Sequence, residues 1–166
     1  MLRQIAALPY RTDGTGVDSP VSVLLVTSRG TGRWVIPKGN AMPGLAPHVA
    51  AAQEAEEEAG VYGSACPTPL GSYRYRKRRG SGASLWVDVD VFPFAVTREI
   101  DVWKEAGQRE RRWFPLAEAA ERVDEDDLKD LIRSFGPSEF KAAAARRSGV
   151  LETLSKNTGV SGMFAW

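Results

Sequence analysis

The segment 47–59 (PHVAAAQEAEEEA) constrains the fold of this chain more than any other stretch of its sequence. It is rich in alanine and glutamate, and neither glycine nor a second proline interrupts it. Pro47 stands in the first turn, where a helix tolerates proline, and Gly60 follows at the position where helices commonly end. These features predict an α-helix over residues 47–59.

The acidic residues of this predicted helix stand at the end where the helix dipole disfavours them. Each glutamate near the negative pole costs about 0.3–1 kcal/mol. Glu54, Glu57 and Glu58 also share one face, because they are three and four residues apart, whereas Glu56 points elsewhere. A divalent cation that prefers oxygen ligands, such as Mg²⁺, would offset this cost. The alternative interpretation is a solvated acidic face without a ligand.

Strand patterns occur on both sides of the predicted helix. β-Branched and alternating runs predict a short first strand near the N-terminus and further strands at 21–27, 34–36, 70–77, 85–96 and 112–114. Helices are predicted at 116–123, 126–135 and 138–147. Strands before and after one helix, with more helices at the end, predict a mixed sheet between helical layers.

Composition excludes several classes of protein. Lys and Arg number 22 and Asp and Glu 21, so the net charge of +1 provides no overall field for nucleic acid. Cys66 is the single cysteine, which excludes an internal disulfide framework and predicts a buried structural thiol. The N-terminus lacks a signal-peptide pattern, and no apolar run approaches the roughly 20 residues that span a bilayer. We therefore expect a cytoplasmic protein that does not associate with membranes.

A pattern that begins at Gly39 and ends at Val61 resembles the 23-residue Nudix box. The box is a Gly, five residues, a Glu, seven residues and then Arg-Glu-apolar-any-Glu-Glu-any-Gly-apolar. Leu45 and Gln53 replace its first Glu and its Arg, which resemble a supporting ion pair in the family. Replacing both partners of a pair can be nearly neutral, so we interpret these changes as a retuned scaffold. The matched positions are Gly39, Glu54, Ala55, Glu57, Glu58, Gly60 and Val61.

The resemblance extends beyond the box. Residues 24–39 (LLVTSRGTGRWVIPKG) and 107–117 (GQRERRWFPLA) are similar to the hydrolases of diphosphoinositol polyphosphates and diadenosine polyphosphates. The resemblance implies an α/β fold, a Nudix-type α/β/α sandwich with a mixed central sheet, as a hydrolase domain over residues 1–136. Residues 137–166 are then expected to form a C-terminal helix and tail packed on the same domain.

The resemblance also implies an enzyme. It would be a Mg²⁺-dependent pyrophosphohydrolase, with Mn²⁺ as an alternative metal, that cleaves a phosphoanhydride in a polyphosphorylated small molecule. A dinucleoside polyphosphate or a diphosphoinositol polyphosphate is the expected substrate. The implied catalytic residues are Glu54, Glu57 and Glu58, and the implied metal ligands are these three side chains and the Gly39 carbonyl oxygen. A further carboxylate from outside the box could come from Glu105 or Glu110.

Basic side chains are expected to bind the phosphates of the substrate. The densest basic run is 74–79 (RYRKRR), in which strand alternation places Arg74 and Arg76 on one face and Tyr75 and Lys77 on the other. Two alternatives stand beside this hypothesis: a solubilising edge strand, and a nucleic-acid surface, which the nearly neutral charge disfavours. The predicted substrate-binding residues are Arg33, Lys38, Arg74, Arg76, Arg109 and Arg111.

A second function class competes with the enzyme. Because Leu45 and Gln53 depart from the box, the chain could be a catalytically weak binding or regulatory module for a phosphorylated ligand or RNA. The retained Glu54, Glu57 and Glu58 argue against it, since a pure binding module has no use for a destabilising acidic cluster. The sequence predicts no particular oligomeric state.

Overall fold

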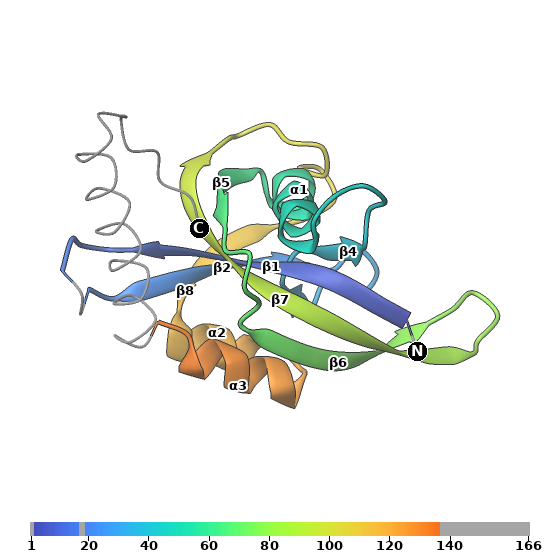
Figure 1. Cartoon of the computed structure of the whole chain (residues 1–166). Coiled ribbons are helices and arrows are strands. Elements are labelled where there is room, and N and C mark those ends of the chain that lie inside the picture. Colours follow the sequence, from blue (N-terminus) through green and yellow to red (C-terminus); the bar gives the residue numbers. More distant parts are fainter. Residues whose placement is uncertain (1, 17–18, 137–166) are drawn as a thin grey trace.

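A single mixed sheet organises the computed structural model, which describes residues 2–16 and 19–136. Its two longest strands, β1 and β7, run parallel and side by side, and every other strand pairing is antiparallel. The remaining strands add to these two, as Figure 1 shows. The strands are β1 (Leu2–Thr12), β2 (Val21–Thr27), β3 (Trp34–Val35), β4 (Lys38–Asn40), β5 (Val61–Ala65), β6 (Gly71–Arg78), β7 (Ser84–Glu99) and β8 (Arg111–Pro115).

The other strands extend the sheet from β1 and β7. Strands β2 and β4 pair with β1, and β2 also pairs with β3 and β8. Strands β5 and β6 pair with β7. The end of β1 near Gln4 therefore contacts β4, whereas the end near Tyr10 contacts β2. This arrangement lets side chains from β4, β1 and β6 gather on one face.

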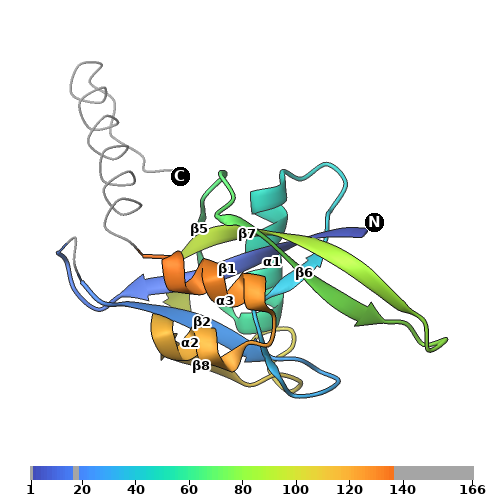
Figure 2. The same ribbon diagram turned by 90° about the horizontal axis from the view of Figure 1, so that it is seen from below.

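Helices cover both faces of the sheet. Helix α1 (Pro47–Ala59) packs through small side chains, including Ala51 and Ala55, on Ile5 and Phe94 of the sheet. Helices α2 (Leu116–Arg122) and α3 (Asp126–Ser134) lie on the opposite face, as Figure 2 shows from below. The predicted α/β/α sandwich with a mixed sheet is therefore confirmed.

Most of the predicted elements are present, and the helix over 47–59 is confirmed with its bounds. Two short strands, β4 and β5, were not anticipated, and β1 is longer than expected. Cys66 is buried, as predicted. The expected helix at 138–147 and the tail to residue 166 lie outside the described residues. Within the described ranges, no helix is long and apolar enough to cross a membrane.

Candidate active site

The C-terminal end of α1 is capped by the segment that connects β7 to β8 and by the first residue of β8. The indole Nε1 of Trp103 donates to the Glu58 carbonyl oxygen at 3.0 Å, and Nη1 of Arg111 donates to the Ala59 carbonyl oxygen at 2.8 Å. The amide of Glu105 donates to the Glu57 carbonyl oxygen at 3.2 Å. These donors satisfy carbonyl groups that a helix end otherwise leaves unpaired, and the Arg111 charge lies at the negative pole. The cap thus offsets part of the cost of the acidic cluster.

Gly60 and Arg111 make this cap compact. Gly60 has a φ of +65°, which favours glycine, and a Cβ there would lie 2.7 Å from Nη1 of Arg111 and 2.8 Å from the Trp103 ring. The guanidinium of Arg111 also lies 4.1 Å from the centroid of that ring. Arg111 was predicted to bind substrate, but its guanidinium is engaged by the helix end and the indole.

Gly39 touches the first of the predicted metal-binding glutamates. The glycine lies in β4, which pairs with β1 beside α1. A Cβ at this position would lie only 2.2 Å from Oε1 of Glu54. The carboxyl group therefore occupies the space that any other residue would need for its side chain, which explains the glycine physically.

The carboxyl groups of Glu54 and Glu58 form a pair in which Glu58 is buried and Glu54 is half-buried. Glu58 is only 5% exposed, and burial raises its pKa to about 8 despite the opposing charge of Arg109. Burial also raises the pKa of Glu54, while a hydrogen bond with Glu58 lowers it. Two carboxyl groups in such contact favour sharing a proton, and a cation in its place would neutralise both. Hard oxygen donors of this kind fit Mg²⁺ or Mn²⁺.

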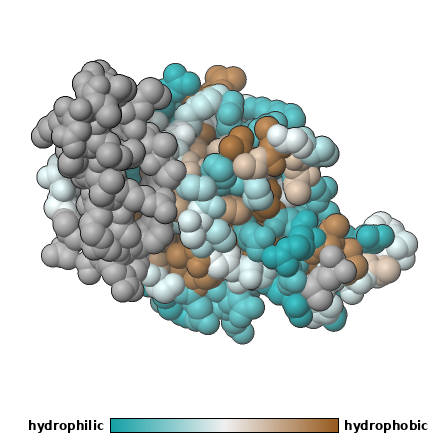
Figure 3. Space-filling model, in the orientation of Figure 1, coloured by the Kyte–Doolittle hydropathy of each residue, from teal (hydrophilic) through white to brown (hydrophobic). Residues whose placement is uncertain are grey.

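Glu57 lies on the outer side of this pair. Its carboxylate accepts a hydrogen bond from Nε2 of Gln53 at 3.3 Å and lies 3.7 Å from Nζ of Lys104. Gln53 therefore supports Glu57 at the position where the box has arginine. Leu45 is 40% exposed near the start of α1, where Figure 3 shows hydrophobic residues at the surface. Among the described residues, no three acidic, histidine or cysteine side chains converge into a preformed metal cluster.

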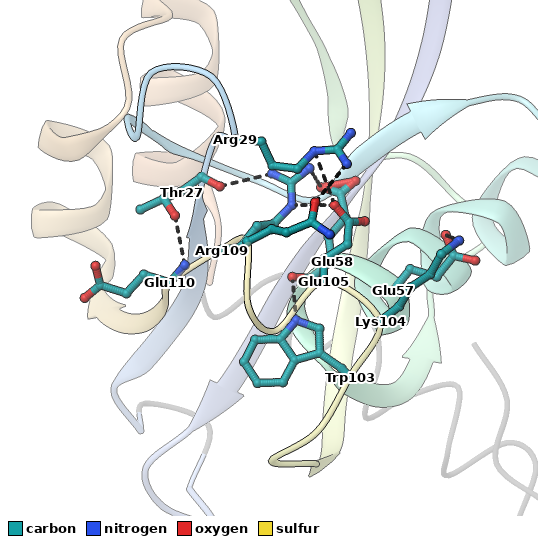
Figure 4. A network of polar contacts seen from close by, with 10 residues as sticks. Thr27, Arg29, Glu57, Glu58, Trp103, Lys104, Glu105, Arg109 and Glu110 are labelled. Atoms are coloured by element: carbon teal, nitrogen blue, oxygen red, sulfur yellow. Dashed lines mark hydrogen bonds and ion pairs between the residues drawn. The ribbon is translucent and has the colours of Figure 1, made fainter.

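Arg109 lies at the centre of the polar network that Figure 4 draws. Its Nε donates to Oε1 of Glu105 at 3.0 Å, and its Nη2 lies 3.4 Å from Oε1 of Glu58. Arg29 also reaches Glu105, at 3.5 Å. The sequence named Glu105 as a candidate carboxylate, and the structure links it to the buried Glu58 through Arg109. The sequence analysis did not name Arg29 as a site residue, although it is a basic residue in the loop directly after β2. Glu110 pairs instead with the exposed Arg112.

Lys38 lies near Glu58 and contacts Tyr75, whose ring is on the face of the sheet that α3 covers. Its Nζ lies 5.0 Å from the centroid of the Tyr75 ring, and the hydroxyl of Tyr75 donates to Oε1 of Gln4 at 2.6 Å. Burial lowers the pKa of Lys38, while the charge of Glu58 opposes that effect. Among the described residues, the ammonium group of Lys38 makes no side-chain hydrogen bond or ion pair, although the backbone of Lys38 pairs with β1. Its ammonium group therefore has capacity for a ligand.

Other predicted phosphate contacts are already paired. Nη2 of Arg33 lies 2.8 Å from Oε1 of Glu125, which precedes α3. Arg74 binds Asp88 at 2.9 Å, and Arg76 lies 4.9 Å from the centroid of the Trp86 ring. Since Tyr73 is buried on the α3 side, strand alternation places Arg74 and Arg76 on the opposite face of β6 from Tyr75 and Lys38. The structure thus places Lys38 where the charge of Glu58 acts on it and pairs Arg33 with Glu125, whereas Arg74 and Arg76 lie on the other face of β6.

Comparisons with known proteins agree with this geometry. The family model of the NUDIX domain matches residues 2–135. Two relatives from Arabidopsis thaliana, "Nudix hydrolase 21, chloroplastic" and "Nudix hydrolase 13, mitochondrial", are 29% and 31% identical over 79% and 77% of this chain. The matches cover 64% and 70% of those relatives, so the chain spans about two thirds of their length.

Solved structures agree on the fold. A C. elegans Ap4A hydrolase in a binary complex superposes with a TM-score of 0.60 at 20% identity, over 86% of this chain and 99% of that one. The E. coli ORF135 protein superposes with a TM-score of 0.55 at 18% identity, over 81% and 87% of the two chains. Because the model of the NUDIX domain matches residues 2–135, most of the chain, the protein belongs to the Nudix family.

Proposed function

We propose that this protein is a metal-dependent hydrolase that cleaves a phosphoanhydride linkage in a polyphosphorylated small molecule. The observation that carries the proposal is the contact between the buried carboxyl group of Glu58 and that of the half-buried Glu54, which lies against Gly39. Burying one carboxyl group in contact with another destabilises the fold, and a bound cation would offset that cost. The name that the relatives share, Nudix hydrolase, supports the same activity.

The proposed mechanism assigns the metal to Glu54, Glu57, Glu58 and the Gly39 carbonyl oxygen. Mg²⁺, or Mn²⁺ in its place, would neutralise charge on the scissile phosphates and orient the attacking water. A carboxylate oxygen of Glu54 or Glu57 accepts the proton of that water. The water oxygen then bonds to one phosphorus while the bridging oxygen leaves with the other phosphate. Lys38 binds an oxygen of the phosphate chain and limits its movement.

The proposed substrate carries more phosphates than a nucleoside diphosphate. Lys38 and Tyr75 lie on the α3 side of the sheet, and Lys77 is the next residue of β6 on that side. Tyr75 and Lys77 are two strand positions apart, which is about 6.6 Å, so Lys77 and the Lys38 beside Tyr75 can contact different phosphates of one chain. A dinucleoside polyphosphate or a diphosphoinositol polyphosphate fits this arrangement.

Hydrolysis in H₂¹⁸O tests the proposed activity. The purified protein would be incubated with Mg²⁺ or Mn²⁺ and a panel of dinucleoside polyphosphates, diphosphoinositol polyphosphates, nucleoside diphosphate sugars and capped RNA. We expect two phosphorylated products, one of which carries a single ¹⁸O by mass spectrometry. Tight binding of a panel compound without turnover under either metal would contradict the hydrolase and support the binding module. Glu57→Gln should lower kcat by about 100-fold or more while the circular dichroism spectrum stays unchanged.

Two neighbouring variants of β6 test the proposed substrate face. Lys77→Gln and Arg76→Gln each remove one positive charge from adjacent positions on opposite faces of the same strand. We expect Lys77→Gln to raise KM for a long phosphate chain by about tenfold, the loss of one charge-assisted contact. Arg76→Gln should change KM by less than about twofold. The reverse result would support the prediction made from the sequence and reject the Lys77 face.

A further inference from the structure

All three nitrogens of the Arg109 guanidinium contact other groups of the protein. Its Nε donates to Oε1 of Glu105 at 3.0 Å, its Nη1 donates to the Thr27 carbonyl oxygen at 3.0 Å, and its Nη2 lies 3.4 Å from Oε1 of Glu58. The side chain is only 10% exposed, and the side chains of Glu58 and Glu105 are 6% and 12% exposed. Because nine tenths of the Arg109 side chain is buried, a phosphate has little access to its guanidinium.

The three acceptors come from three different parts of the fold. Glu58 lies on α1, Glu105 on the segment between β7 and β8, and Thr27 at the end of β2. The planar guanidinium fixes the directions of its N–H groups, which a lysine cannot do. Arg109 therefore ties the carboxylate of Glu58 and that of Glu105 to a rigid strand, as Figure 4 shows.

We propose that Arg109 is a positioning residue, which holds the carboxylates of Glu58 and Glu105 in the orientation that the metal site requires, and that it does not bind the substrate. The inference rests on the proposed metal-dependent hydrolysis. Groups that orient metal ligands from outside the coordination shell typically change metal affinity or activity by about 10–100-fold when they are removed. A substrate-binding arginine would instead change KM.

Arg109→Gln tests the inference through two measurements. Mn²⁺ affinity, determined by electron paramagnetic resonance without substrate, should weaken by about tenfold or more. In hydrolysis kinetics with saturating metal, kcat should fall by about tenfold or more while KM changes less than about twofold. Arg122→Gln is the matched control, because it removes an equally short arginine–glutamate pair, 3.0 Å from Glu118, at an exposed site. It should leave both quantities unchanged.

Further variants separate positioning from general damage. Glu105→Gln combined with Arg109→Gln should reduce kcat little more than Arg109→Gln alone, since each change breaks the same contact between Arg109 and Glu105. Arg109→Lys keeps the charge and serves where Arg109→Gln fails to fold, and it should recover only part of the Mn²⁺ affinity. A tenfold rise in KM with unchanged kcat and Mn²⁺ affinity would overturn the inference. Mn²⁺ affinity is measured without turnover. If the parent protein hydrolyses nothing but Arg109→Gln still weakens Mn²⁺ binding, the proposed function is rejected and the positioning role is kept.

Discussion

Gly39→Ala separates the metal site from the stability of the fold. The added Cβ would lie 2.2 Å from Oε1 of Glu54, whereas ordinary contact begins at 3.4 Å, so the carboxyl group must move by about 1.2 Å. A displacement of about 1 Å in a catalytic group can cost about 100-fold in rate. We therefore expect kcat to fall by about 100-fold, which corresponds to about 2.7 kcal/mol in the activation barrier.

The stability of Gly39→Ala should change far less than its activity. The obstructing atoms are the far end of a flexible side chain, and the φ of Gly39 is not positive, so alanine fits the backbone. Alanine also restricts the unfolded chain, which stabilises by about 0.4–1 kcal/mol and offsets the displacement of Glu54. We expect the free energy of unfolding in urea to stay within about 1 kcal/mol of the parent.

The assay for this variant compares three quantities: kcat, the unfolding free energy and the rise in melting temperature that Mg²⁺ produces. Mg²⁺ should raise the melting temperature of the parent, because it binds the native state, and should raise that of Gly39→Ala less. Gly80→Ala is the control, since a Cβ there meets nothing within 4 Å. Parent-like kcat and Mg²⁺ response in Gly39→Ala would refute the role of the Gly39–Glu54 contact.

Three other experiments test the remaining parts of the site. Arg111→Met removes the cationic cap of α1 and should lower the free energy of unfolding by about 2–3 kcal/mol in urea, while Arg111→Lys should lower it less. Without metal, the folded protein keeps a proton on Glu58 up to about pH 8, which the unfolded chain releases near 4.5, so stability should fall as pH rises between these values. Glu58→Gln should flatten that dependence. Tyr75→Phe removes the hydrogen bond to Gln4 and should cost about 1 kcal/mol in the same assay.

The sequence predicted the regular elements better than their contacts. Helix α1 was found because proline, glycine and an uninterrupted alanine-rich segment all indicate the same bounds. Strand β5 was missed because its identity depends on partners far along the chain. Its Gly63 lies against the backbone of Ala95, where a Cβ would be 1.9 Å from the carbonyl oxygen. Local propensity carries no information about such an approach.

The site was predictable as a set of residue types but not as a set of partners. The spacing of the glutamates indicated the acidic cluster, and alternation separated Arg74 from Tyr75. Neither indicated which face of β6 lies beside Lys38, because the order of the strands around β1 decides that. The same limit applies to Arg109, which a basic run marks only as a charge. Burial and three acceptors give it a different role.

The parallel pairing of β1 with β7 has a consequence for biosynthesis. Leu2–Thr12 leaves the ribosome well before its longest partner, Ser84–Glu99, which follows more than seventy residues later. The apolar stretch from Ile5 to Leu8, buried in the finished protein, must wait without that partner. Contacts between distant segments slow folding and leave unpaired strand edges open to aggregation. A nascent chain arrested before residue 84 should therefore be protease-sensitive and associate with chaperones, whereas one extended past residue 136 should be resistant.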